Sequence, residues 1–107
     1  MIRAQHARKR LPNRRAGTSF DFEHRGIRYV ATYSRFADGG VAELFISNHK
    51  AGSHVDACVR DLGVAASLIL QFGCPLDTLR GAVLRNADGT PATALGAALD
   101  IISGRTR

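Results

Sequence analysis

The stretch that decides the fold is GIRYVATYSRFADGGVAELFIS, residues 26–47. Apolar and polar side chains alternate along residues 27–33 and again along residues 41–47. A period of two residues is typical of β-strands that bury one face. Between the two runs stands Asp38-Gly39-Gly40, which favours a tight turn because glycine adopts a positive φ at little cost. The stretch therefore predicts two antiparallel strands joined by a short turn.

A third strand and a long helix flank this hairpin. Phe20 and Phe22 alternate with polar residues, and Arg25-Gly26 provides a turn into the next strand. After residue 47 the period becomes helical, because apolar residues recur at three- and four-residue steps. We expect the following residues to form the buried face of this helix: Val55, Cys58, Val59, Leu62, Ala65, Ala66, Ile69 and Phe72.

Capping residues mark where the helices begin and end. Ser53-His-Val-Asp56 has the form of a capping box, and Gly73 followed by Pro75 ends the first helix. A second, shorter helix follows Pro75. We expect Pro91 to occupy the first helical position of a third helix that ends at Gly104. The residues expected to face inward from the last two helices are Leu76, Leu79, Val83, Leu95, Ala98, Leu99 and Ile102.

These elements together predict an α+β fold. An antiparallel meander of three or four strands is followed by three helices packed on one face. Because such a sheet leaves edges, two copies could pair edge to edge as a homodimer. The chain holds no run of about eighteen apolar residues and no apolar segment near its N-terminus, so we expect no membrane contact, no secretory signal and a cytoplasmic location.

The positive charge lies at the N-terminus. The 107 residues include 15 Lys and Arg against 9 Asp and Glu, a net charge of +6. Residues 1–15 hold six of the basic residues and no acid, whereas residues 16–107 are balanced. We therefore divide the chain into a basic, flexible arm (residues 1–15) and a single α+β domain (residues 16–104). The candidate contacts to a nucleic acid or a partner protein are Arg3, Arg8, Lys9, Arg10, Arg14 and Arg15.

The loop before the first long helix is the candidate ligand site. It combines a helix N-terminus, a lysine, a glycine that permits close approach and a serine hydroxyl, which together suit a phosphate or carboxylate. The alternative is an ordinary helix start, with the lysine solvated and the serine only capping the helix. The candidate anion-binding residues are His49, Lys50, Gly52 and Ser53.

The two cysteines offer little chemistry. Cys58 and Cys74 are sixteen residues apart, without a CxxC motif or Cys/His ligand spacing, so we expect no disulfide framework and no metal site. Cys58 belongs to the predicted apolar face and is interpreted as a small hydrophobic residue. Cys74 lies in the turn between two helices.

The order of the motifs along residues 11–103 carries a resemblance to a known family. The stretches concerned are Gly26–Thr32, Val41–Ile46, Lys50–Ser53, Leu68–Gly73 and Pro75–Gly81. In this order they resemble the TSCPD domain, which stands at the C-terminal end of adenosylcobalamin-dependent (class II) ribonucleotide reductases and also occurs as small stand-alone proteins. The motif that names the family would fall at Thr90-Pro-Ala-Thr93, where its cysteine and aspartate are missing.

The resemblance implies a stand-alone accessory or regulatory module. It would act by contacts with a ribonucleotide reductase or another protein, or by binding a nucleotide or phosphate. We expect no catalytic residue and no cofactor, because two cysteines cannot supply both a thiyl radical and a reducing pair of thiols. In DNA precursor synthesis the chain would then assist a reductase and would not itself reduce ribonucleotides.

The sequence is also compatible with two other functions. The first is a small nucleic-acid-binding protein whose arm neutralises phosphates. The second is an enzyme that uses Cys74 or a histidine.

Overall fold

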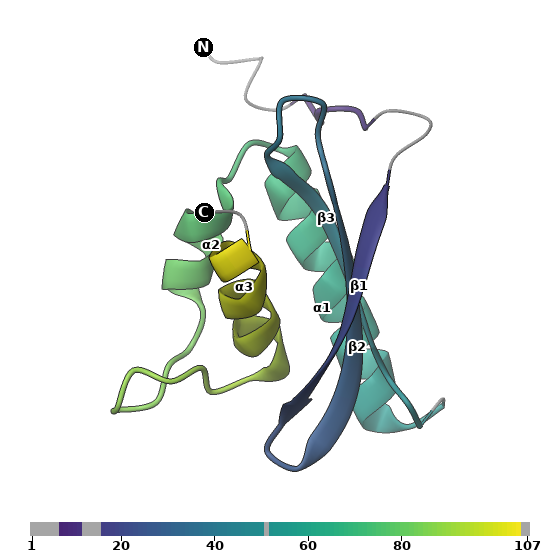
Figure 1. Ribbon diagram of the computed structural model, residues 1–107, viewed down its shortest axis with the longest axis vertical. Helices are drawn as coiled ribbons and strands as arrows, with labels where there is room; N and C mark the ends of the chain where they lie inside the picture. Colours follow the sequence, from purple (N-terminus) through teal and green to yellow (C-terminus); the bar gives the residue numbers. More distant parts are fainter. Residues whose placement is uncertain (1–6, 12–15, 51, 106–107) are drawn as a thin grey trace.

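The computed structural model describes residues 7–11, 16–50 and 52–105. The strands β1 (Gly17–His24), β2 (Ile27–Arg35) and β3 (Val41–Asn48) form one antiparallel sheet in the order β1-β2-β3. The helices α1 (His54–Gln71), α2 (Leu76–Ala82) and α3 (Ala94–Arg105) follow. Figure 1 shows α2 and α3 together on one side and α1 running along β3. The predicted α+β fold, a strand meander followed by three helices, is confirmed.

Both predicted strand turns are present. Arg25 (φ 53°) and Gly26 (φ 81°) join β1 to β2, so that His24 pairs with Ile27. Gly39 (φ 95°) lies in the turn between β2 and β3, where the Gly40 amide donates to Asp38 Oδ1 at 3.0 Å. The turns therefore follow from residues that tolerate a left-handed backbone.

The inner face of the sheet forms the core. In register, Phe20 of β1 lies beside Ala31 of β2, which lies beside Ile46 of β3. Tyr29, Tyr33, Ala42 and Leu44 are buried on the same face, as the period of two predicts. Leu99 and Ile102 of α3 are fully buried in the same cluster. The core thus joins all three strands to the C-terminal helix.

Helix α1 contacts β3 through the backbone edge of the strand that faces away from β2. Ser67 Oγ accepts from the Leu44 amide at 2.9 Å and lies 2.9 Å from the Leu44 carbonyl oxygen. Gln71 Nε2 donates to the Ala42 carbonyl at 3.1 Å, and Asp56 Oδ1 accepts from the Asn48 amide at 2.8 Å. These side chains satisfy backbone groups that an edge strand would otherwise leave open to pairing. Pairing of two copies through the β3 edge would have to displace them.

The buried face of α1 differs from the predicted one. Of the eight residues expected inside, Val59 and Ala66 are buried, whereas Val55, Cys58, Leu62, Ala65, Ile69 and Phe72 are exposed. The buried positions are Asp56, Val59, Gly63, Ala66, Ser67, Leu70 and Gln71. The surface on which α1 packs, the edge of β3, explains this difference. A strand edge presents polar backbone groups at close range, so the helix needs small or hydrogen-bonding side chains there.

The start of α3 was also predicted wrongly. The helix begins at Ala94 rather than at Pro91, with Thr93 Oγ1 accepting from the Gly96 amide at 3.2 Å. Pro91 instead forms an isolated antiparallel bridge with Arg85. The Asn86 amide donates to the Thr90 carbonyl at 2.8 Å, and this hairpin-like turn holds Pro91 extended.

Within the ranges that the structure describes, no helix is both long enough and apolar enough to cross a bilayer.

Two glycine substitutions test the close contact between α1 and β3. A Cβ at Gly63 would lie 3.0 Å from the Leu44 carbonyl oxygen, so Gly63→Ala should destabilise the protein by about 1–3 kcal/mol. Gly81, in α2, has no atom within 4 Å of such a Cβ, so Gly81→Ala should stabilise by up to about 1 kcal/mol through its better helix propensity. Urea unfolding measures both changes. Equal effects of the two substitutions would contradict the edge contact.

Candidate functional site

The loop between β3 and α1 adopts the predicted helix cap. Ser53 Oγ accepts from the Asp56 amide at 3.1 Å, and the Ser53 amide donates to the Lys50 carbonyl at 3.2 Å. The Lys50 amide donates to Asn48 Oδ1 at 2.6 Å, and Gly52 has a φ of 83°. The capping role of Ser53 is confirmed, and the loop brings Lys50, Gly52 and Ser53 together at the N-terminus of α1.

The carboxylate of Asp56 already lies where this loop presents its hydrogen-bond donors. The side chain is 6% exposed, and it accepts from the Asn48 amide and from Arg60 Nε, each at 2.8 Å. The Asn48 amide, the Arg60 guanidinium and the Gly52 amide together hold the pKa of Asp56 below its usual value. A phosphate bound here would meet this negative charge, and the exposed side chains of His49 and Lys50 would have to supply its attraction.

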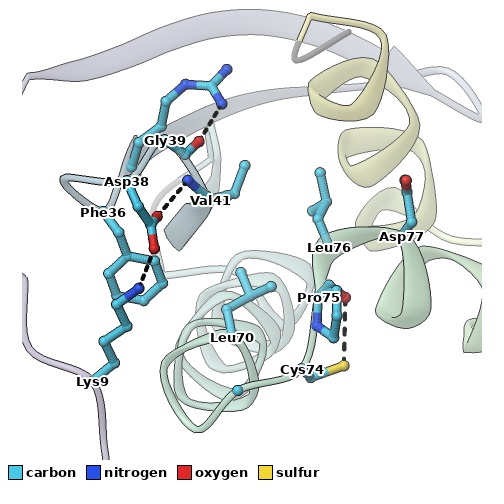
Figure 2. A pocket seen from close by; sticks show the side chains of 13 residues that line it. Lys9, Phe36, Asp38, Gly39, Val41, Leu70, Cys74, Pro75, Leu76 and Asp77 are labelled. Atoms are coloured by element: carbon cyan, nitrogen blue, oxygen red, sulfur yellow. Dashed lines mark hydrogen bonds and ion pairs between the residues drawn. The ribbon is translucent and has the colours of Figure 1, made fainter.

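A hollow of about 390 Å³ forms a second candidate site. It lies between Lys9, the turn from β2 to β3, and the turn from α1 to α2 (Figure 2). Val41, Leu70 and Leu76 supply apolar walls. Its charged lining residues are Lys9, Arg35, Asp38 and Asp77. This combination suits a peptide segment. Apolar side chains of the peptide can contact the apolar walls, and its polar backbone can contact the charged residues.

Lys9 closes one side of this hollow. Its Nζ forms an ion pair with Asp38 Oδ2 at 2.5 Å and lies 4.3 Å from the centroid of the Phe36 ring. The hydrogen bond from Lys9, followed by that from the Gly40 amide, lowers the pKa of Asp38. Figure 2 shows Lys9, Phe36 and Asp38 side by side at this rim.

The described part of the basic arm is attached to the end of α1. The Lys9 amide donates to the Gln71 carbonyl at 2.7 Å, and Arg8 Nε donates to Gln71 Oε1. Arg10 is exposed. The remaining predicted contact residues, Arg3, Arg14 and Arg15, lie outside the described residues.

The two thiols lie at opposite ends of α1. Cys58 is exposed rather than buried as predicted, and its Sγ lies 3.5 Å from His54 Nε2. Cys74 is half-buried at the hollow, where its Sγ lies 3.5 Å from the Pro75 carbonyl oxygen (Figure 2). Among the side chains that the structure describes, no group of three or more His, Cys, Asp or Glu could hold a metal ion.

The segment at which the family motif would fall is tied to α3. Asp100 Oδ1 accepts from Arg80 Nε at 2.8 Å and from Arg85 Nη2 at 2.6 Å, while Oδ2 accepts from Arg85 Nη1 at 2.9 Å. Arg85 contributes most to lowering the pKa of Asp100. Arg85 also forms an isolated backbone β-bridge with Pro91, so its ion pair with Asp100 links the segment around Pro91 to α3.

Sequence reasoning missed the hollow and the burial of Asp56. The hollow gathers residues from three separate turns, for which there is no local pattern. The capping-box motif places Asp56 in the first turn of the helix, but it does not indicate that the carboxylate reaches back to the Asn48 amide.

Comparison with known proteins gives short matches to one class of enzyme. The chain is 37% identical over 70 residues to the vitamin B12-dependent ribonucleotide reductase of Agrobacterium fabrum, which covers 65% of this chain and 6% of that protein. Against the enzyme of the same name from Streptomyces clavuligerus it is 33% identical over 78 residues, 73% of this chain and 8% of the relative. The Streptantibioticus cattleyicolor enzyme is 35% identical over 71 residues, which cover 66% of this chain and 12% of that protein.

The chain therefore matches a small part of each of these reductases. No family model matches it. No solved structure matches it either.

The lowered pKa of Asp56 predicts a pH dependence of stability. A carboxyl whose folded pKa lies below the unfolded value of 3.8 stabilises the fold above that value, and this contribution is lost as the pH falls through the lowered folded pKa. Asp56→Asn should therefore flatten the fall in unfolding free energy below about pH 4. Urea unfolding at several pH values measures the slope, and Asp61→Asn, which removes an exposed carboxylate from the same helix, is the matched control. Equal slopes for Asp56→Asn and the unsubstituted protein would contradict the assignment.

Proposed function

We propose that this chain is a cytoplasmic, TSCPD-like accessory module of B12-dependent ribonucleotide reductases, and that it acts through protein contacts. The observation that carries the proposal is the repeated match of 70–78 residues to a short part of these enzymes. The order of motifs within an α+β domain supports the same relationship. The partner would be the catalytic portion of such a reductase.

The distance between the thiols supports an accessory role. Thirteen residues of α1 separate Cys58 from the end of the helix at Gln71, a rise of roughly 20 Å. A disulfide needs Cα atoms about 4.4–6.8 Å apart, so Cys58 and Cys74 cannot act as one redox pair in this fold. Reduction of a ribonucleotide requires such a reducing pair, and it would have to come from the partner.

The hollow beside Lys9 is the surface that suits a segment of the partner chain. Leu70 and Leu76 can receive an apolar side chain, and the ion pair of Lys9 with Asp38 offers charged groups to the segment's backbone. The β3–α1 loop supports an anionic ligand less well, because its amides donate to Asp56. We therefore favour protein contact over nucleotide binding.

The arm also favours a protein partner. Arg8 and Lys9 make hydrogen bonds within the chain, to Gln71 and Asp38, and would have to give them up to reach nucleic-acid phosphates. The competing function, nucleic-acid binding by the arm, predicts affinity that falls steeply with salt.

Binding to a purified reductase tests the proposal. The probe is the Agrobacterium fabrum enzyme from which the matched segment has been deleted, and we expect this chain to bind it. Lys9→Glu should weaken binding about tenfold or more, because it places a like charge beside Asp38 at the hollow. Arg28→Glu makes the same charge change on the exposed outer face of the sheet and should leave binding unchanged. Isothermal calorimetry measures all three affinities.

Three results would contradict this assignment. The first is no binding by the unsubstituted chain, and the second is equal weakening by the two charge reversals. The third is formation of deoxyribonucleotides by the chain alone. Binding to duplex DNA that is lost on deleting residues 1–15, without binding to the reductase, would favour the nucleic-acid function.

A further inference from the structure

The solvent side of α1 is apolar to an unusual degree. Nine large apolar side chains are exposed in the part of the chain that the structure describes, and six of them belong to α1 and its C-cap residue. They are Val55, Leu62, Val64, Leu68, Ile69 and Phe72, each 36–50% exposed. From Leu62 to Gln71 the helix carries no charged residue, although a surface helix of a globular protein typically has a charged outer face.

Six exposed residues form a regular stripe along this helix. Their spacing alternates between three and four residues, which is the pattern of a and d positions in a coiled coil. The stripe consists of Val55, Cys58, Leu62, Ala65, Ile69 and Phe72, all of them exposed. The residues that α1 buries lie on a different side of the helix from this stripe. The chain therefore carries an apolar stripe with coiled-coil spacing that stays exposed in the described structure.

We propose that a second copy of this chain covers the stripe, with the two α1 helices packed antiparallel about a two-fold axis. In that arrangement Val55 faces Phe72 of the second copy, Cys58 faces Ile69, and Leu62 faces Ala65. Each layer thus sets a larger side chain against a smaller one. All six residues find a partner, because the stripe is complementary to itself when reversed.

Charge also favours this occupant. The stripe contains no charged residue, so pairing it with itself brings no like charges together across the seam. The described arm residues Arg8 and Lys9 are held at the C-terminal end of α1, by Gln71. Antiparallel packing places the two arms at opposite ends of a helix about 27 Å long, well beyond the Debye length of about 8 Å.

The area of the stripe predicts a weak dimer. One helix of this length offers on the order of 500 Å² per copy, below the roughly 800 Å² of a standard specific interface. We expect a dissociation constant of about 1–100 µM. The stripe shares no residue with the hollow beside Lys9, so dimerisation and the proposed function can fail independently.

Sedimentation equilibrium of the purified chain from about 1 to 500 µM tests the dimer. We expect a concentration-dependent shift from monomer to dimer, weakened at least tenfold by Leu62→Glu and by Ile69→Glu. Val64→Glu changes an exposed apolar residue of the same helix outside the stripe, where Val64 lines a separate hollow with Phe45, and should leave the equilibrium unchanged. Circular dichroism verifies that each variant is folded. A monomer throughout this range, or equal effects of the three substitutions, would overturn the proposal.

Disulfide trapping tests the direction and register of the helices. In a Cys74→Ser background, Ile69→Cys should allow a mild oxidant to link its new thiol to Cys58 of the second copy, giving a covalent dimer. Val64→Cys in the same background is the matched control and should remain largely uncrosslinked. Mass spectrometry of the peptides identifies the link. A bond between two Cys58 residues as the main product would overturn the antiparallel register.

Discussion

The structure depends on hydrogen bonds between the side chains of α1 and the backbone edge of β3. Ser67, Gln71 and Asp56 bond to Leu44, Ala42 and Asn48, while a Cβ at Gly63 would press on the strand backbone. An edge strand with open backbone groups tends to pair with another chain, and burying those groups without partners costs free energy. Helix α1 therefore occupies the place of a fourth strand and supplies side-chain donors and acceptors where a strand would use its backbone.

This contact organises both candidate sites. At the start of α1, Asp56 reaches back to the β3–α1 loop and receives hydrogen bonds from Asn48 and Arg60. At its end, Gln71 holds Arg8 and Lys9 of the arm, so that Lys9 lies beside Asp38 at the hollow. The same contact turns the apolar side of the helix toward solvent. One helix face thus determines the charge within the loop, the wall of the hollow and the exposed stripe.

The sequence predicted the elements better than their packing. Alternation along the strands identified the inner residues Tyr29, Ala31 and Tyr33, and Ser53 was recognised as a helix cap; both follow from neighbours in the chain. The exposure of Cys58 could not be predicted, because apolar spacing indicates the buried side of a helix only where the partner surface is apolar. The hollow was missed since its walls come from residues more than sixty positions apart, such as Lys9 and Leu76.

By itself the sequence determined the strands, their turns, which depend on a positive φ as at Gly39, and the start of α1, which depends on the local cap at Ser53. The tertiary structure alone decided which side of α1 is buried. Apolar periodicity assumes an apolar partner surface, whereas the partner here is a strand edge of N–H and C=O groups. Such an edge selects small and polar side chains for the buried side, and the apolar residues therefore face outward.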